Sequence, residues 1–140
     1  LSMATSITQE TIVVGQRLDT FQPSHSVGAV VSFTGYVRDT NHGQNVSSLY
    51  LEHYPGMTER MLDELEAKAR NQWPLLAVEI VHRVGEMTLG EVIVFVAVAS
   101  AHRQAAFEAA SYIMDQLKSQ VPLWKRETQQ ANKQGIWLTP

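Results

Sequence analysis

The stretch VIVFVAVA at residues 92–99 is apolar at every position and rich in β-branched side chains. Such an unbroken run of strand length predicts a β-strand that is covered on both faces. Ser100 follows as the expected cap of a helix over residues 101–120, which Pro122 should stop. The apolar positions that recur there at helical spacing are Ala106, Ala110, Ile113, Met114, Leu117 and Val121. The run therefore predicts the central strand of a sheet, followed by a long helix.

Shorter segments on either side of this pair alternate apolar and polar residues or concentrate β-branched ones. They predict strands at residues 11–15, 28–37, 46–54, 76–84, 123–128 and 136–138. The side chains expected to face inward from the 76–84 strand are Leu76, Val78, Ile80, His82 and Val84. Thr58 is the expected N-cap of a helix at about residues 59–73, while a short helix or turn is expected within 16–27 and a mobile loop at 38–45. Because the strands come mostly in adjacent pairs, the sequence predicts an α+β fold with a largely antiparallel sheet.

Length and charge restrict the class of protein. The chain has 140 residues, 44% of them hydrophobic, which suits a single domain over residues 3–140; Leu1 and Ser2 are expected to be a cloning remnant. A net charge of -3 and a pI near 5.9 give no overall attraction to nucleic acid or to anionic membranes. No apolar run reaches the roughly 18 residues of a spanning helix, and the N-terminus lacks a signal-peptide pattern, so we expect a cytoplasmic protein.

The residue types that are missing exclude several kinds of chemistry. The chain has no cysteine, which excludes disulfides, thiolate metal sites and a cysteine nucleophile. The five histidines show no short ligand spacing, so we expect neither a metal nor a cofactor. His53 and His82 fall on inward strand faces and are interpreted as hydrogen-bonded core residues.

The candidate chemistry is cationic. Arg38 directly follows a predicted strand, His102 and Arg103 begin the long helix, and Lys118 lies in its last turn. A helix start favours anions, so His102 and Arg103 indicate an anion site there. The residues that follow on the next strand are Lys125, Arg126 and Glu127. Each group could also serve structure alone: a C-terminal lysine stabilises the helix dipole, a loop arginine is solvated, and charges protect an edge strand.

The length of the predicted helix separates two of these groups. His102 and Lys118 are 16 residues apart, which is about 24 Å along a straight helix. One subunit therefore cannot bring both side chains to one small-molecule pocket. We predict a homodimer in which a second copy brings His102 and Arg103 to Lys118 and Lys125.

An ordered series of motifs resembles the large, catalytic subunit of molybdopterin synthase (MoaE type). The series covers about residues 28–127 and reads GAVVSFTGYVR at 28–38, LEHYPGMTE at 51–59, HRVGE at 82–86, SAHR at 100–103, FEA at 107–109, MDQLK at 114–118 and PLWKRE at 122–127. The resemblance implies an α/β-hammerhead-type α+β fold and a homodimer that becomes a heterotetramer with two small ubiquitin-like sulfur-carrier subunits. The implied reaction transfers sulfur from the carrier's C-terminal Gly-Gly thiocarboxylate to cyclic pyranopterin monophosphate, making the dithiolene of molybdopterin.

The resemblance also implies roles for individual residues. Lys118 would contact the thiocarboxylate and Lys125 the pterin, both as catalytic residues. Arg38 would hold the phosphate together with His102 and Arg103 of the neighbouring subunit. The remaining residues implied at the substrate-binding site are Tyr36, Val37, Arg126 and Glu127.

Two departures from the family pattern leave an alternative open. Tyr36 stands where many members have lysine, and no arginine follows Trp137 before the chain ends at Pro140. These features suit a non-catalytic scaffold that binds a ubiquitin-like tail or a phosphorylated ligand, although both lysines are present. A second alternative, an RNA- or nucleotide-binding module using Arg38, Arg103 and Arg126, is disfavoured by the acidic pI.

Overall fold

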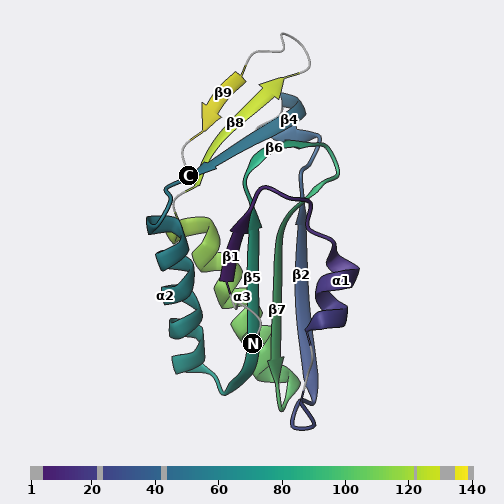
Figure 1. The fold of residues 1–140 in the computed structure, drawn as a ribbon, viewed down its shortest axis with the longest axis vertical. Coiled ribbons are helices and arrows are strands. Elements are labelled where there is room, and N and C mark those ends of the chain that lie inside the picture. The colour runs from purple at the N-terminus through teal and green to yellow at the C-terminus, as the bar shows by residue number, and fades with distance from the viewer. Residues whose placement is uncertain (1–4, 22–23, 42–43, 122, 130–134, 139–140) are drawn as a thin grey trace.

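The protein is described by a computed structural model, which places residues 5–21, 24–41, 44–121, 123–129 and 135–138; for 40–41, 44–47, 124–129 and 135–138 only the backbone is described. The described strands form two sheets (Figure 1). The first has the order β1-β5-β7-β2 and comprises Thr5–Thr8, Leu75–Arg83, Val92–Ser100 and Ala29–Tyr36. Within it β1 and β5 are parallel, whereas β7 is antiparallel to both β5 and β2.

The second sheet lies beyond one end of the first (Figure 1). Its path is β3-β4-β8-β9, comprising Thr40–Asn41, Gln44–His53, Leu123–Gln129 and Gly135–Leu138, and β6 (Gly85–Thr88) pairs with β4. These strands all pair in antiparallel fashion. The expectation of an α+β fold with largely antiparallel pairing is confirmed.

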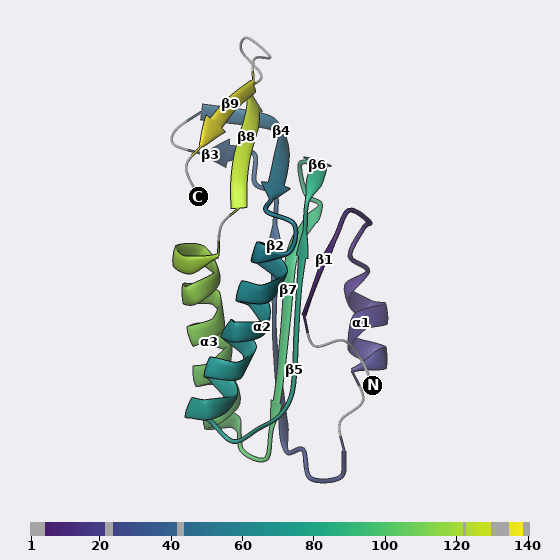
Figure 2. The same cartoon turned by 60° about the vertical axis from the view of Figure 1, so that its left-hand side comes forward.

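The helices cover the two faces of the first sheet unequally (Figure 2). The long helices α2 (Met57–Gln72) and α3 (Arg103–Gln120) lie on one face, and the short helix α1 (Val14–Thr20) lies on the other. Strand β7 contributes to both interiors: Val94, Val96 and Val98 join the large cluster with α2 and α3. Phe95, Ala97 and Ala99 join the smaller one near α1. The prediction that residues 92–99 form a strand covered on both faces is confirmed. No described helix is long and apolar enough to cross a membrane.

Short elements differ from the sequence prediction. The strand expected at 11–15 is wrong, because β1 lies at Thr5–Thr8 and α1 begins at Val14. Ile12 nevertheless buries its side chain in the cluster with Phe21, although its backbone belongs to no strand. The loop expected at 38–45 instead contains β3 and the start of β4, and the four-residue strand β6 was not expected.

Helix caps and one strand end also differ. Helix α2 begins after Gly56 (φ 86°), whose N–H donates to Glu59 Oε1 at 2.7 Å. The expected cap Thr58 is buried inside the first turn. Helix α3 begins at Arg103 after His102, so Ser100 is not its cap but the last residue of β7. Leu76 is exposed rather than inward, because the β5–β7 register shifts between Leu75 and Ala77. Pro122 lies outside the described residues, and α3 ends at Gln120.

Candidate functional site

A cavity of about 310 Å³ lies where the C-terminal end of α3 meets β7 and the first residue of β8; we call it the Lys118 cavity. Its apolar wall consists of Ile93, Val94, Met114, Leu117, Val121 and Leu123, and its polar lining residues are His82, Asp115 and Lys118. Lys118 is exposed in the last turn of α3, where the helix dipole favours a cation. A mostly apolar hollow with one cation at its edge can accept a slender chain that ends in an anion.

His82 is both a core residue and a cavity residue. It is 9% exposed, and its Nδ1 lies 2.9 Å from the carbonyl oxygen of Arg83. Since a carbonyl only accepts, Nδ1 carries the proton in this contact. The interpretation of His82 as a buried, hydrogen-bonded residue is confirmed, but its place in the Lys118 cavity was missed. The only signal in the sequence was a single histidine among the inward apolar positions of β5.

The end of β2 lies at the same end of the molecule as Lys118. Tyr36 pairs with Val92 across the β2–β7 ladder, and the next residues of β7, Ile93 and Val94, line the Lys118 cavity. Val37 is buried, whereas Tyr36 and Arg38 on either side of it are exposed. The structure therefore brings the expected substrate residues 36–38 to the strands that wall this cavity.

Strand β8 carries three further expected residues. Its first residue, Leu123, lines the Lys118 cavity, so Lys125 follows only two residues later on the same strand. The backbones of Lys125, Arg126 and Glu127 pair with residues 51, 50 and 49 of β4. Their side chains lie outside the described part of the chain.

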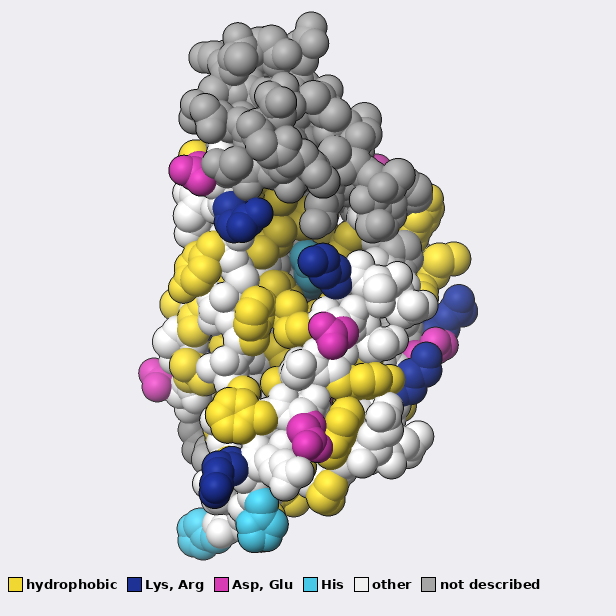
Figure 3. All heavy atoms as spheres, turned by 180° about the vertical axis from the view of Figure 1, so that it is seen from behind, with side chains coloured by type: hydrophobic (Ala, Val, Ile, Leu, Met, Phe, Trp, Pro, Cys, Tyr) yellow, Lys and Arg dark blue, Asp and Glu magenta, His cyan; other side chains and the backbone are white. Residues whose placement is uncertain are grey.

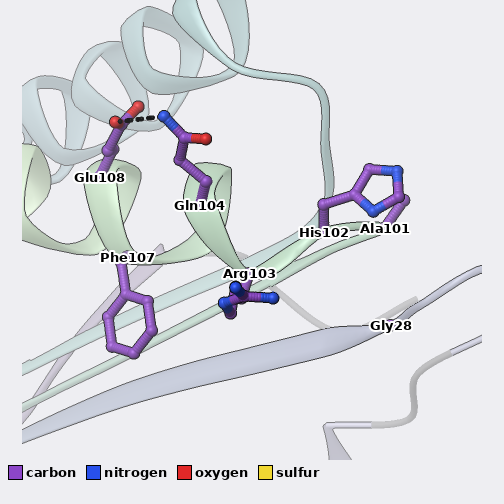
Figure 4. A pocket seen from close by; sticks show the side chains of 7 residues that line it. All are labelled: Gly28, Ala101, His102, Arg103, Gln104, Phe107 and Glu108. Carbon is purple, nitrogen blue, oxygen red and sulfur yellow. Dashed lines mark hydrogen bonds between the residues drawn. The ribbon is translucent and has the colours of Figure 1, made fainter.

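His102 and Arg103 lie at the opposite end of α3. They line a second cavity of about 690 Å³ with Gly28 and Phe107, which we call the His102 cavity (Figure 4). Figure 4 shows Arg103 and Phe107 on one side of α3 and the hydrogen-bonded pair Gln104 and Glu108 on the other. Among the described residues the two cavities share no lining side chain. One chain thus separates the expected site into two parts, as the helix length predicts.

Gly28 lines the His102 cavity but was not among the expected site residues. Its N–H donates to the carbonyl of Ser100 at 3.0 Å, and a Cβ added at Gly28 would lie 2.2 Å from the carbonyl oxygen of Ala101. Only glycine therefore fits beside the turn that leads to His102, Arg103 and the rest of α3. The sequence signal is one glycine before a strand, a pattern too common in proteins to identify a site.

The turn before β7 holds an ion pair close to the end of β2. Glu91 Oε1 lies 2.5 Å from Arg83 Nη1, and Glu91 Oε2 accepts from the backbone N–H and the hydroxyl of Thr88 at 2.6 and 2.9 Å. The Thr88 N–H, followed by Arg83 and the Thr88 hydroxyl, lowers the pKa of Glu91 to about 2. Among the described residues, no three His, Asp or Glu side chains group as a metal site.

Comparisons with known proteins identify the family of this chain. The family described as MoaE protein matches residues 7–120. The molybdopterin synthase catalytic subunit of Pseudomonas aeruginosa is 51% identical over 126 residues, which is 89% of this chain and 84% of that protein. The Escherichia coli K12 protein of the same name is 59% identical over 100 residues, 71% of this chain and 67% of that protein.

Solved structures agree in fold. Molybdopterin synthase from Staphylococcus aureus superimposes with a TM-score of 0.89 at 31% identity, covering 100% of both chains. A chain from the complex of subunits 1 and 2 of the Helicobacter pylori molybdopterin-converting factor has a TM-score of 0.80 at 19% identity, covering 96% of this chain and 90% of that one, and shows the fold alone. The chain therefore belongs to the MoaE family, the molybdopterin synthase catalytic subunits, which are sulfurtransferases of molybdenum cofactor biosynthesis.

Proposed function

We propose that this subunit transfers sulfur from the C-terminal thiocarboxylate of a small ubiquitin-like carrier to cyclic pyranopterin monophosphate, which becomes molybdopterin. The observation that carries the proposal is the Lys118 cavity, a mostly apolar hollow with an exposed lysine at the end of α3. A carrier tail that ends in two glycines is slender enough for such a hollow, and its anionic end would meet the ammonium group. The Helicobacter pylori relative, solved as a complex of two subunits, supports a carrier as the partner.

The chemistry needs no nucleophile from this chain. The carrier's thiocarboxylate sulfur attacks a carbon of the pterin's side chain and forms a C–S bond, while a C–O bond at that carbon breaks and its oxygen leaves as water or on the phosphate. The carrier is then joined to the pterin as a thioester. Water then breaks the acyl C–S bond, so that the carrier leaves as a carboxylate and sulfur remains on the pterin. Lys118 would stabilise the negative charge of the attacking group and of the acyl intermediate. Lys125 would contact the pterin, with Arg126 and Glu127 supporting the same strand.

The phosphate requires the second copy of the chain. Arg38 would bind it by bidentate hydrogen bonds, beside Tyr36 and Val37, and the partner's His102 and Arg103 would complete the site. A two-fold axis across α3 places the N-terminal end of one helix beside the C-terminal end of the other. Phe33 and Phe107 are 41% and 61% exposed on β2 and α3, on the side of the first sheet that carries α3, an apolar surface that such a dimer would cover. Figure 3 shows hydrophobic side chains along this face, with basic side chains towards both its ends.

Reconstitution tests the proposal directly. The protein is mixed with a thiocarboxylated carrier ending in Gly-Gly and with cyclic pyranopterin monophosphate, and dithiolene product is measured. We expect Lys118→Ala to lower turnover by about 100-fold or more while leaving the dimer folded. The matched control is Lys68→Ala, because Lys68 is an exposed lysine on α2, away from both cavities. If Lys118→Ala retains the activity of this control, the proposed role of the Lys118 cavity is wrong.

A further inference from the structure

The chain passes between the two sheets at several neighbouring points, and one side-chain cluster links them. Arg83 ends β5 in the first sheet, Thr88 ends β6 in the second, and Glu91 precedes β7 back in the first. The Glu91 carboxylate contacts both others, at 2.5 Å to Arg83 Nη1 and at 2.6 and 2.9 Å to the N–H and hydroxyl of Thr88. We call Arg83, Thr88 and Glu91 the turn clamp.

The turn clamp also holds the point where β2 leaves the first sheet. The carbonyl oxygen of Glu91 accepts from Val37 N–H at 2.9 Å, and the carbonyl oxygen of Val37 accepts from Gly90 N–H at 2.9 Å. Both backbone groups of Val37 are therefore used, and its side chain is 6% exposed. Arg38 is the next residue, so the direction in which its side chain leaves the backbone depends on the turn at residues 88–91.

Burying the charged groups of the turn clamp costs free energy, and a contribution to stability alone does not explain why these residues are charged. Arg83 is 8% exposed, and its Nε has no hydrogen-bond partner among the described residues. Taking an ion pair out of water costs free energy, and apolar residues of similar volume often stabilise as much or more. An ion pair does restrict orientation. A carboxylate that is held by a guanidinium, a backbone N–H and a hydroxyl can adopt few other orientations, so the turn that carries it is fixed as well.

We infer that the turn clamp positions Arg38, so that Arg83 and Glu91 set how the Arg38 guanidinium meets the substrate's phosphate. The clamp residues do not touch substrate and act through the backbone of Val37. This inference rests on the proposed function, which assigns the phosphate to Arg38. It predicts that loosening the clamp weakens substrate binding more than it slows the chemical steps at Lys118.

The test measures kcat and KM for the pterin monophosphate in the carrier-supplied assay. We expect Glu91→Gln to raise KM about tenfold and to change kcat less than about twofold, because the phosphate contact loosens while Lys118 stays in place. Thr88→Val keeps the ion pair, removes one hydrogen bond and should raise KM about two- to threefold. The matched control is Glu79→Gln, which breaks the part-buried Arg17–Glu79 ion pair (2.8 Å) on another part of the first sheet. It should leave KM unchanged.

A double-mutant cycle with Arg38→Ala separates positioning from general loosening. If the clamp acts through Arg38, Glu91→Gln has no further effect on KM once Arg38 is alanine. An equal increase in both backgrounds, or an equal increase in the Glu79→Gln control, overturns the inference while the phosphate role of Arg38 stands. If Arg38→Ala itself leaves KM unchanged, the proposed phosphate role is wrong, and the inference falls with it.

Discussion

At the scale of single residues, Glu91 makes the stability of the fold depend on pH in the acidic range. Its pKa is lowered from 4.5 to about 2, first by the hydrogen bond from the Thr88 N–H and then by Arg83. A carboxyl group with a lowered folded-state pKa stabilises the protein above its unfolded pKa, and that contribution is lost as the pH falls through the folded value. The carboxylate therefore supports the fold fully at neutral pH and loses its effect between about pH 4.5 and 2.

Chemical unfolding at a series of pH values measures this effect. We expect the difference in free energy of unfolding between the wild type and Glu91→Gln to be constant at neutral pH. It should shrink as the pH falls below about 4.5, because protonation removes the same charge from the wild type. Other carboxyl groups titrate in both proteins and cancel in the difference. A difference that stays constant down to about pH 2 would contradict the lowered pKa.

Charge and position identify some candidate site residues from the sequence, but not those that are defined by contacts in the fold. Lys118 and Arg103 could be assigned to opposite ends of one helix, because the apolar spacing fixes the helix and counting fixes the distance. His82 could not be assigned to a cavity, since its pattern fits any buried strand position. Arg83 and Glu91 are eight residues apart, and nothing in their spacing shows that a turn brings them together.

At the scale of secondary structure, the strands that were missed are short, although β9, which has four residues, was predicted. Strand β7 and helix α3 are long, so their own periodicity determines their type. Strands β1, β3 and β6 have four residues or fewer, and pairing with a partner strand matters more for them than their own propensity. Residues 11–15 show the opposite error, because an apolar run predicted a strand where Ile12 only fills a core position and α1 begins at Val14.

The start of α3 depends on the close approach of β2. We expect Gly28→Ala to lower the free energy of unfolding by about 1–3 kcal/mol, because the new Cβ would collide with the Ala101 carbonyl oxygen. Relief of the collision would move His102 and Arg103, so the KM for the pterin monophosphate should rise as well. The control is Gly15→Ala in α1, where a Cβ meets nothing within 4 Å. It should raise stability, by up to about 1 kcal/mol. Equal effects of the two substitutions would show that the close approach is unimportant.

At the scale of the whole molecule, we propose that dimerisation is a condition of activity, because the candidate site is divided between the two ends of α3. The Lys118 cavity and the His102 cavity lie at opposite ends of α3. Strands β5, β7 and β8 contribute to the lining of the first, whereas the described lining of the second comes from α3, the two residues before it and Gly28. A monomer would therefore offer a tail-binding lysine without the partner's phosphate-binding residues. An antiparallel pair of chains would create two complete sites, each with Lys118 from one copy and Arg103 from the other.

Complementation between two defective proteins distinguishes shared sites from sites within one chain. Lys118→Ala and Arg103→Ala homodimers should each be nearly inactive, since both of their sites lack one group. After unfolding and random reassociation of equal amounts, about half of the dimers are mixed, and each mixed dimer has one site with both groups intact. We therefore expect activity to recover to about a quarter of the wild-type value. If Lys118 and Arg103 of one chain served the same site, mixing could restore no activity, because every chain in the mixture lacks one of these two residues. Activity that stays at the average of the two homodimers would therefore rule out the shared site.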